Sequence, residues 1–152
     1  MPFGSEGEED GIGLALSGGG FRAMLFHTGS LLRLNELGLL ARLNRISSVS
    51  GGSLISGRLA VRWNALNFVE GVARNFREEV ADPVVRFSTR LIDAPSILMG
   101  FLPLTDAAGV AASFYRRHLV GRATLQDLPE RPRFVFNATH LTKRITDHLI
   151  ER

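Results

Sequence analysis

Residues 12–38, IGLALSGGGFRAMLFHTGSLLRLNELG, decide the fold class of this 152-residue chain. They begin with a short apolar run, Ile12 to Leu16, which is typical of a buried parallel strand. The glycines at 18–20 end this run. From Phe21 to Leu37 apolar residues recur at spacings of three or four, which predicts a helix, and Gly38 stands where a helix C-terminal glycine belongs.

The same order of elements follows at once. A second short strand is predicted around Arg45 to Val49, Ser50-Gly51-Gly52 breaks it, and the pattern turns helical again from Ser53. Strand, glycine turn and helix thus occur twice within about sixty residues. This alternation indicates an α/β fold with a mainly parallel sheet and right-handed crossovers.

The rest of the chain is predicted in outline. Apolar residues spaced by four favour a helix over 66–80, ended by Asp82-Pro83. A further helix is predicted over 107–119 and a third strand over 133–138. We expect residues 1–10 to be a disordered lead and residues 11–152 to form a single domain.

Composition excludes several classes of protein. The absence of cysteine rules out disulfides, zinc–thiolate sites and a cysteine nucleophile. No cluster of His, Asp and Glu has the spacing of metal ligands, so neither a metal nor a cofactor is expected. The formal charge of +3 comes from scattered arginines without a nucleic-acid motif. We therefore expect no nucleic-acid partner, and contact with an anionic lipid surface stays open.

The sequence also bears on the compartment. The acidic, glycine-rich start lacks the basic and apolar regions of a signal peptide. The longest apolar segment, Ile97 to Leu104, is interrupted by Gly100 and Pro103 and falls far short of the ~20 residues that span a bilayer. It is interpreted as a lid, a membrane-touching loop or buried core. We expect a cytoplasmic protein by default.

The first glycine turn, Ser17 to Ala23, joins a predicted strand to a helix N-terminus. Its glycines permit positive φ and close approach of a ligand, and the helix start adds unpaired N–H donors. Such a turn can bind a phosphate or a developing oxyanion. The segment also fits G-x-G-x-x-G/A, so a nucleotide-binding α/β domain stays open, as does a joint without a ligand. A P-loop is excluded because Gly-Lys-Ser/Thr is absent.

The second turn, Ser48 to Ser53, resembles the G-x-S-x-G nucleophile elbow, with Ser48 in place of the first glycine. The alternative is a serine-rich N-cap of the following helix. The two turns together are more informative than either one. In a parallel sheet both emerge at the carboxyl ends of the strands, where one would supply N–H donors and the other a hydroxyl nucleophile.

The segments S-G-G-G-F-R-A and S-x-S-G-G-S resemble the patatin-like phospholipases and, more distantly, the cytosolic phospholipase A2 core. Residues 123–129 and 134–139 are similar to the bacterial branch of this family. The resemblance implies a three-layer α/β/α fold and hydrolysis of acyl esters of lipids or phospholipids. It makes Ser50 the nucleophile of a Ser–Asp dyad. It places Gly18, Gly19, Gly20 and Arg22 in the oxyanion loop.

The aspartate of that dyad is not found. The family carries it in a later D-G-G or D-G-A motif, and no Asp after the second strand is followed by glycine. A histidine triad is disfavoured, because no Asp/Glu-then-His arrangement stands out and His27 is expected to pack on the first helix. We therefore expect an N-terminal part of the domain, truncated before the motif. An inactive remnant that binds lipid or protein is the alternative.

Overall fold

The computed structural model describes residues 10–92 and 107–138. The predicted lead up to residue 9, the apolar segment 97–104 and the tail 139–152 lie outside the described residues. The principal elements are β1 (Ile12–Leu16), α1 (Gly20–Glu36), β2 (Leu43–Val49), α2 (Gly51–Arg62), β3 (Phe68–Val69), β4 (Val72–Ala73), α3 (Asp82–Ile92), α5 (Ala107–Tyr115) and β5 (Arg133–Asn137).

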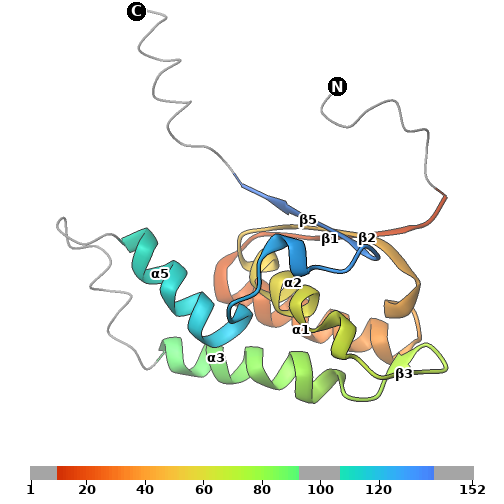
Figure 1. Cartoon of the computed structure of the whole chain (residues 1–152). Coiled ribbons are helices and arrows are strands. Elements are labelled where there is room, and N and C mark those ends of the chain that lie inside the picture. Colours follow the sequence, from red (N-terminus) through yellow and green to blue (C-terminus); the bar gives the residue numbers. More distant parts are fainter. Residues whose placement is uncertain (1–9, 93–106, 139–152) are drawn as a thin grey trace, which may run out of the picture.

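The centre of the fold is a parallel three-stranded sheet in the order β1-β2-β5. Its register places Ile46 of β2 between Leu14 of β1 and Phe134 of β5, so these apolar side chains share one face. The described helices lie along that face (Figure 1). This parallel sheet flanked by helices confirms the predicted α/β class and is consistent with the three-layer α/β/α fold.

The core forms between this sheet face and the helices. α2 packs on all three strands, and α1 packs against α2. The largest fully buried side chains come from every layer: Met24 and Leu31 of α1, Ile46 of β2, Ile55 and Leu59 of α2, Phe76, and Phe87 of α3. Burial of these side chains fixes α1 and α2 with their N-termini at the carboxyl edge of the strands.

The helix predicted over 66–80 is wrong. The chain instead forms the hairpin β3–β4, followed by a π-helical turn, Arg77–Ala81. Glu70 and Gly71 both have positive φ, +52° and +81°, as the central residues of a tight hairpin turn require. The apolar spacing still has a structural cause, because Phe76 and Val80 are buried in the core.

Asp82-Pro83 does not end a helix, contrary to expectation. The π-helical turn Arg77–Ala81 runs directly into α3, and Asp82 and Pro83 are the first two residues of that helix. The helix predicted over 107–119 is present as α5 followed by the π-helical turn Arg116–Val120. No helix of the described residues is long and apolar enough to cross a membrane.

A buried amide fastens the hairpin to α1. Asn35, 3% exposed, donates through Nδ2 to the carbonyl of Ala73 at 3.0 Å and accepts from the Ala73 N–H at 2.8 Å. We expect Asn35→Ala to lower the free energy of unfolding by about 2–4 kcal/mol, because it leaves a void and two unpaired backbone groups. Urea unfolding followed by circular dichroism measures this. The control is Asn64→Ala, at an exposed position. An equal loss of unfolding free energy in both variants would contradict the role of the buried Asn35 amide.

Candidate active site

Ser50 occupies the turn between β2 and α2. Its φ of 52° and ψ of −122° lie in a region that residues with a Cβ rarely adopt, and its side chain is exposed. Ser50 is the N-cap residue of α2 by position, but its side chain makes no capping hydrogen bond. The serine-rich N-cap alternative therefore does not describe what this hydroxyl does.

The two glycines after Ser50 are required by close contacts with the first turn. A Cβ on Gly51 would lie 2.1 Å from the carbonyl oxygen of Gly20, and a Cβ on Gly52 would lie 2.6 Å from that of Leu16. Both distances are far below a van der Waals contact, and the atoms that would be met are backbone. The elbow can therefore approach the first turn this closely only with glycine at both positions.

The first turn lies directly beside Ser50. Gly19 and Gly20 have φ of +137° and +63°, conformations that favour glycine. A Cβ on Gly18 would lie 3.2 Å from the Cβ of Ser50. The structure thus brings together the glycine turn and the serine that the sequence analysis paired.

Unpaired backbone donors converge on the same place. In α2 the first donor bonded within the helix is Ser53, whose N–H reaches the Ser50 carbonyl at 2.8 Å. The N–H groups of Gly51 and Gly52 precede it and so have no partner within the helix. α1 begins at Gly20, so the N-termini of two helices present N–H groups and partial positive charge beside Ser50.

A polar network at the ends of β2 and β5 supports the elbow. Asn137 donates through Nδ2 to Ser47 Oγ at 2.9 Å and to the Ser48 carbonyl at 3.1 Å. Ser48 Oγ donates to the Val135 carbonyl and accepts from Ser53 Oγ, both at 3.3 Å. Asn137 was not among the predicted site residues. The sequence signal that could have identified it is a polar residue at the carboxyl end of the third predicted strand.

No base reaches the serine within residues 10–92 and 107–138. The Ser50 hydroxyl makes no hydrogen bond there. His27 is a packed residue of α1, as expected. It is 7% exposed, and its Nε2 lies 3.1 Å from the Ser17 carbonyl oxygen. Asp127 closes a capping box with Thr124, whose N–H and hydroxyl hydrogen bonds lower the pKa of its carboxyl.

Comparison with known proteins decides the family. The sequence matches the family described as patatin-like phospholipase over residues 14–150, which is most of the chain. The chain belongs to this family. It is 45% identical over 51 residues to a protein of Saccharomyces cerevisiae named "Putative meiotic phospholipase SPO1". That match covers 34% of this chain and 8% of the yeast protein, so the chain spans a small part of that relative's length. No solved structure matches significantly.

The remaining predicted site residue of this patatin-like chain is Arg22. It lies in the first turn of α1, two residues after Gly20, and is exposed. Within the described part of the chain its guanidinium has no hydrogen bond or ion pair. The same part of the chain contains no group of three or more His, Cys, Asp or Glu side chains that could hold a metal ion.

The strained backbone of Ser50 predicts that glycine is more stable than alanine at this position, which is the reverse of the order inside a helix. We expect Ser50→Gly to be more stable than Ser50→Ala by about 1 kcal/mol, because a residue with a Cβ costs about 1–3 kcal/mol in such a conformation and glycine does not. At Ser30, in the middle of α1, the order reverses, and glycine is about 1 kcal/mol less stable than alanine. Urea unfolding of the four variants tests this. The same order at both positions would contradict it.

Proposed function

We propose that this chain is a serine lipid acyl hydrolase domain in which Ser50 is the nucleophile and Gly18, Gly19, Gly20 and Arg22 form the oxyanion site. The observation that carries the proposal is the direct contact of the two turns. The Ser50 Cβ lies 3.2 Å from the position of a Cβ on Gly18, at the N-termini of α1 and α2. Nucleophile and backbone donors thus share one small region, as acyl transfer requires.

The reaction would proceed in two steps. A base removes the proton of Ser50 Oγ while this oxygen attacks the ester carbonyl carbon, and the carbonyl electrons move to its oxygen. The backbone N–H groups of the glycine turn and of Gly51 stabilise that oxyanion, and the Arg22 guanidinium adds positive charge. The carbon–oxygen bond to the alcohol then breaks, the alcohol takes the proton, and an acyl-serine remains. In the second step, water attacks the carbonyl carbon of the acyl-serine in the same way and releases the fatty acid.

The dyad aspartate of the proposed reaction is not found in this sequence, because no Asp after the second strand is followed by glycine. The family resemblance implies an aspartate, and the described residues bring no carboxylate or imidazole within hydrogen-bonding distance of Ser50. A serine hydroxyl without a base is a weak nucleophile, and general base catalysis contributes about 10²–10⁴-fold. For this reason the second candidate is a non-catalytic domain that binds lipid or protein.

Exposed apolar side chains support a lipid or phospholipid substrate. Leu25 and Phe26 follow the glycine turn on α1 and are 38% and 71% exposed, and Val49, next to Ser50, is 41% exposed. Apolar groups exposed around a polar site suit an acyl chain or a membrane surface. The nucleotide-binding alternative rests on the first turn by itself, and the pairing of that turn with Ser50 favours the hydrolase.

The direct test is acylation by a p-nitrophenyl ester of a fatty acid. We expect the wild-type chain to release a burst of p-nitrophenol equal to the amount of protein. The Ser113→Ala variant should give the same burst, and the Ser50→Ala variant should give none. Ser113 is the matched control because it is an exposed serine on α5. A folded chain that gives no burst would favour the non-catalytic candidate. A burst that persists in Ser50→Ala would exclude Ser50 as the nucleophile.

A further inference from the structure

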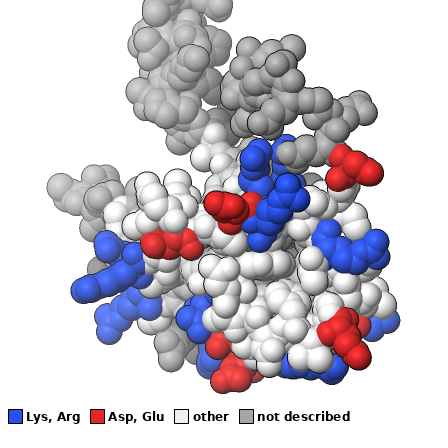
Figure 2. Space-filling model, turned by 45° about the vertical axis from the view of Figure 1, so that its right-hand side comes forward, with Lys and Arg blue, Asp and Glu red and all other residues white. Residues whose placement is uncertain are grey.

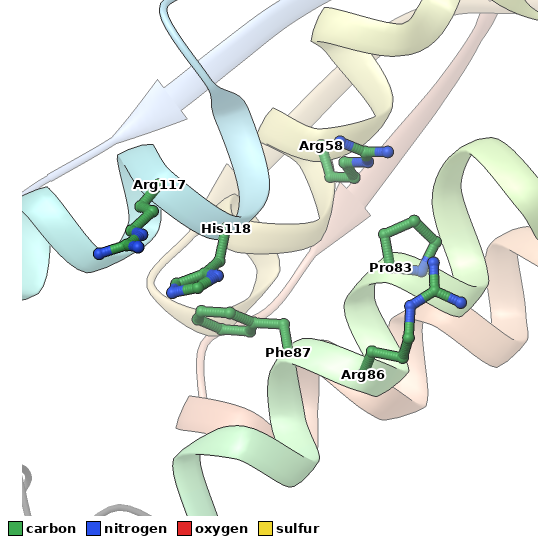
Figure 3. A pocket seen from close by; sticks show the side chains of 6 residues that line it. All are labelled: Arg58, Pro83, Arg86, Phe87, Arg117 and His118. Atoms are coloured by element: carbon green, nitrogen blue, oxygen red, sulfur yellow. The ribbon is translucent and has the colours of Figure 1, made fainter.

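A pocket lies away from Ser50, between α2, α3 and the π-helical turn Arg116–Val120 (Figure 3). Its volume is about 330 Å³, and its lining residues are Arg58, Pro83, Arg86, Phe87, Arg117 and His118. Arg58 is eight residues beyond Ser50 on α2, which is about 12 Å along a helix. The pocket is therefore separate from the proposed catalytic serine.

Among the described residues the lining is basic and contains no carboxylate. Arg58 donates through Nε to the Glu79 carbonyl at 2.8 Å and through Nη1 to the Leu119 carbonyl at 3.1 Å. These bonds fix its guanidinium, but they do not neutralise its charge, because both acceptors are uncharged. The nearby Glu79 carboxylate is paired with Arg62.

The surroundings of Arg58 lower the pKa of its guanidinium. Burial lowers the pKa of its guanidinium, Arg62 and Arg86 lower it further, and Glu79 opposes them. Arg86 is exposed, and its guanidinium turns to the Pro83 side of the pocket that Arg58 also lines (Figure 3). Within the described residues the Arg86 guanidinium has no hydrogen bond or ion pair. Arg58 and Arg86 line one pocket, and the nearby Glu79 carboxylate is already paired with Arg62, which favours binding of an anion between the two guanidinium groups.

Aromatic rings form the other wall of this pocket. Phe87 is 2% exposed, and its ring centroid lies 6.5 Å from that of His118 and 5.3 Å from that of Phe114. Arg117 lies on the far side of the His118–Phe87 pair from Arg86 (Figure 3). The packed rings hold the turn that carries Arg117 against α3, so the basic groups stand on rigid elements.

We propose that this pocket is a second binding site, which takes a phosphate group between Arg58 and Arg86, with Arg117 on the opposite side of the pocket. Planar guanidinium groups bind phosphate oxygens in pairs of hydrogen bonds, and none of the described lining residues is a carboxylate that would compete for them. The site is local. Figure 2 shows basic and acidic side chains interspersed over the face that it displays, so a uniformly basic surface does not account for the pocket. The proposal does not depend on the chemistry of Ser50.

The test measures binding to the whole chain with two probes. Inorganic phosphate is titrated by calorimetry at constant ionic strength. Phosphatidylcholine vesicles with and without phosphatidic acid are used for co-flotation. The variants are Arg86→Gln and Arg117→Gln. Their matched controls are Arg42→Gln and Arg74→Gln, which change the same charge at exposed positions outside the pocket. Circular dichroism establishes that each variant is folded.

We expect Arg86→Gln to weaken phosphate binding about tenfold or more, because a charge-assisted pair of hydrogen bonds is lost, and Arg117→Gln to weaken it less. The control variants and Ser50→Ala keep the wild-type affinity. Binding of inorganic phosphate with this pattern assigns a soluble phosphate ligand, and binding only to phosphatidic acid vesicles assigns a lipid headgroup. Equal weakening in all four arginine variants, or no binding of either probe, would overturn the proposal.

Discussion

Replacing Gly51 or Gly52 by alanine is expected to lower the free energy of unfolding by about 3 kcal/mol. The added methyl group would meet backbone that a rotamer change cannot move. The carbonyl oxygen of Gly20 lies 2.1 Å from the Gly51 Cβ position, and that of Ser17 lies 2.7 Å from the Gly52 Cβ position. Either variant must push β1 and the glycine turn away from the elbow. The change is therefore expected to disturb the sheet edge and the site together.

Gly57 supplies the control on the same helix. A Cβ there would lie 3.5 Å from Val120 Cγ1, an ordinary contact, and alanine is the better helix former. We expect Gly57→Ala to be neutral or to gain up to about 1 kcal/mol. Urea unfolding of the three variants distinguishes the cases. If Gly51→Ala were as stable as Gly57→Ala, the described contact between the two turns would be wrong.

Replacing Gly19 by alanine is expected to slow acylation of Ser50 about 10²-fold, with a smaller effect on folding. Gly19 has φ of +137° and ψ of 24°, and a Cβ on it would lie 3.1 Å from the Cβ of Ala23. A residue with a side chain avoids this conformation, so the turn must rearrange. Its N–H groups would then no longer point at the place where the proposed oxyanion develops. That geometry is what a preorganised oxyanion site depends on.

The rate constant of the p-nitrophenol burst measures this effect. Gly29→Ala is the matched control, because Gly29 is exposed on the same helix α1 and its Cβ position meets no heavy atom within 4 Å. We expect Gly29→Ala to react at the wild-type rate. A Gly19→Ala variant that acylates as fast as Gly29→Ala would exclude the glycine turn from oxyanion stabilisation.

The sequence predicts the strand–turn–helix units well, because their signals are local. The apolar run of β1, the glycines after it and the helical spacing of α1 lie within 27 consecutive residues, and β2 and α2 repeat the pattern. The hairpin β3–β4 is different. Its apolar residues have helical spacing, but Glu70 and Gly71 reverse the chain. The helical spacing of Phe76 and Val80 reflects their burial in the core, and the chain there forms a π-helical turn.

The two sites likewise differ in how far the sequence predicts them. Ser50 and the glycine turn can be paired from the sequence, because parallel strands end at one edge and each turn follows a strand. The contribution of Asn137 depends on β5, which is 89 residues from Ser48 in the chain. The basic pocket combines α2, α3 and the turn at Arg117, whose packing no local pattern encodes. Long-range packing is the information that sequence periodicity lacks.

The most direct test of the central claim is to map the adduct formed by a fluorophosphonate probe on the whole chain. Tandem mass spectrometry of the tryptic peptide from Ile46 to Arg58 separates Ser50 from the other serines of that segment. The proposed site predicts an adduct on Ser50, formed about 10²-fold faster than on the exposed Ser113, because Ser50 lies at a helix N-terminus and Ser113 lies inside α5. An adduct on another serine of the peptide, or equal rates at Ser50 and Ser113, would contradict it.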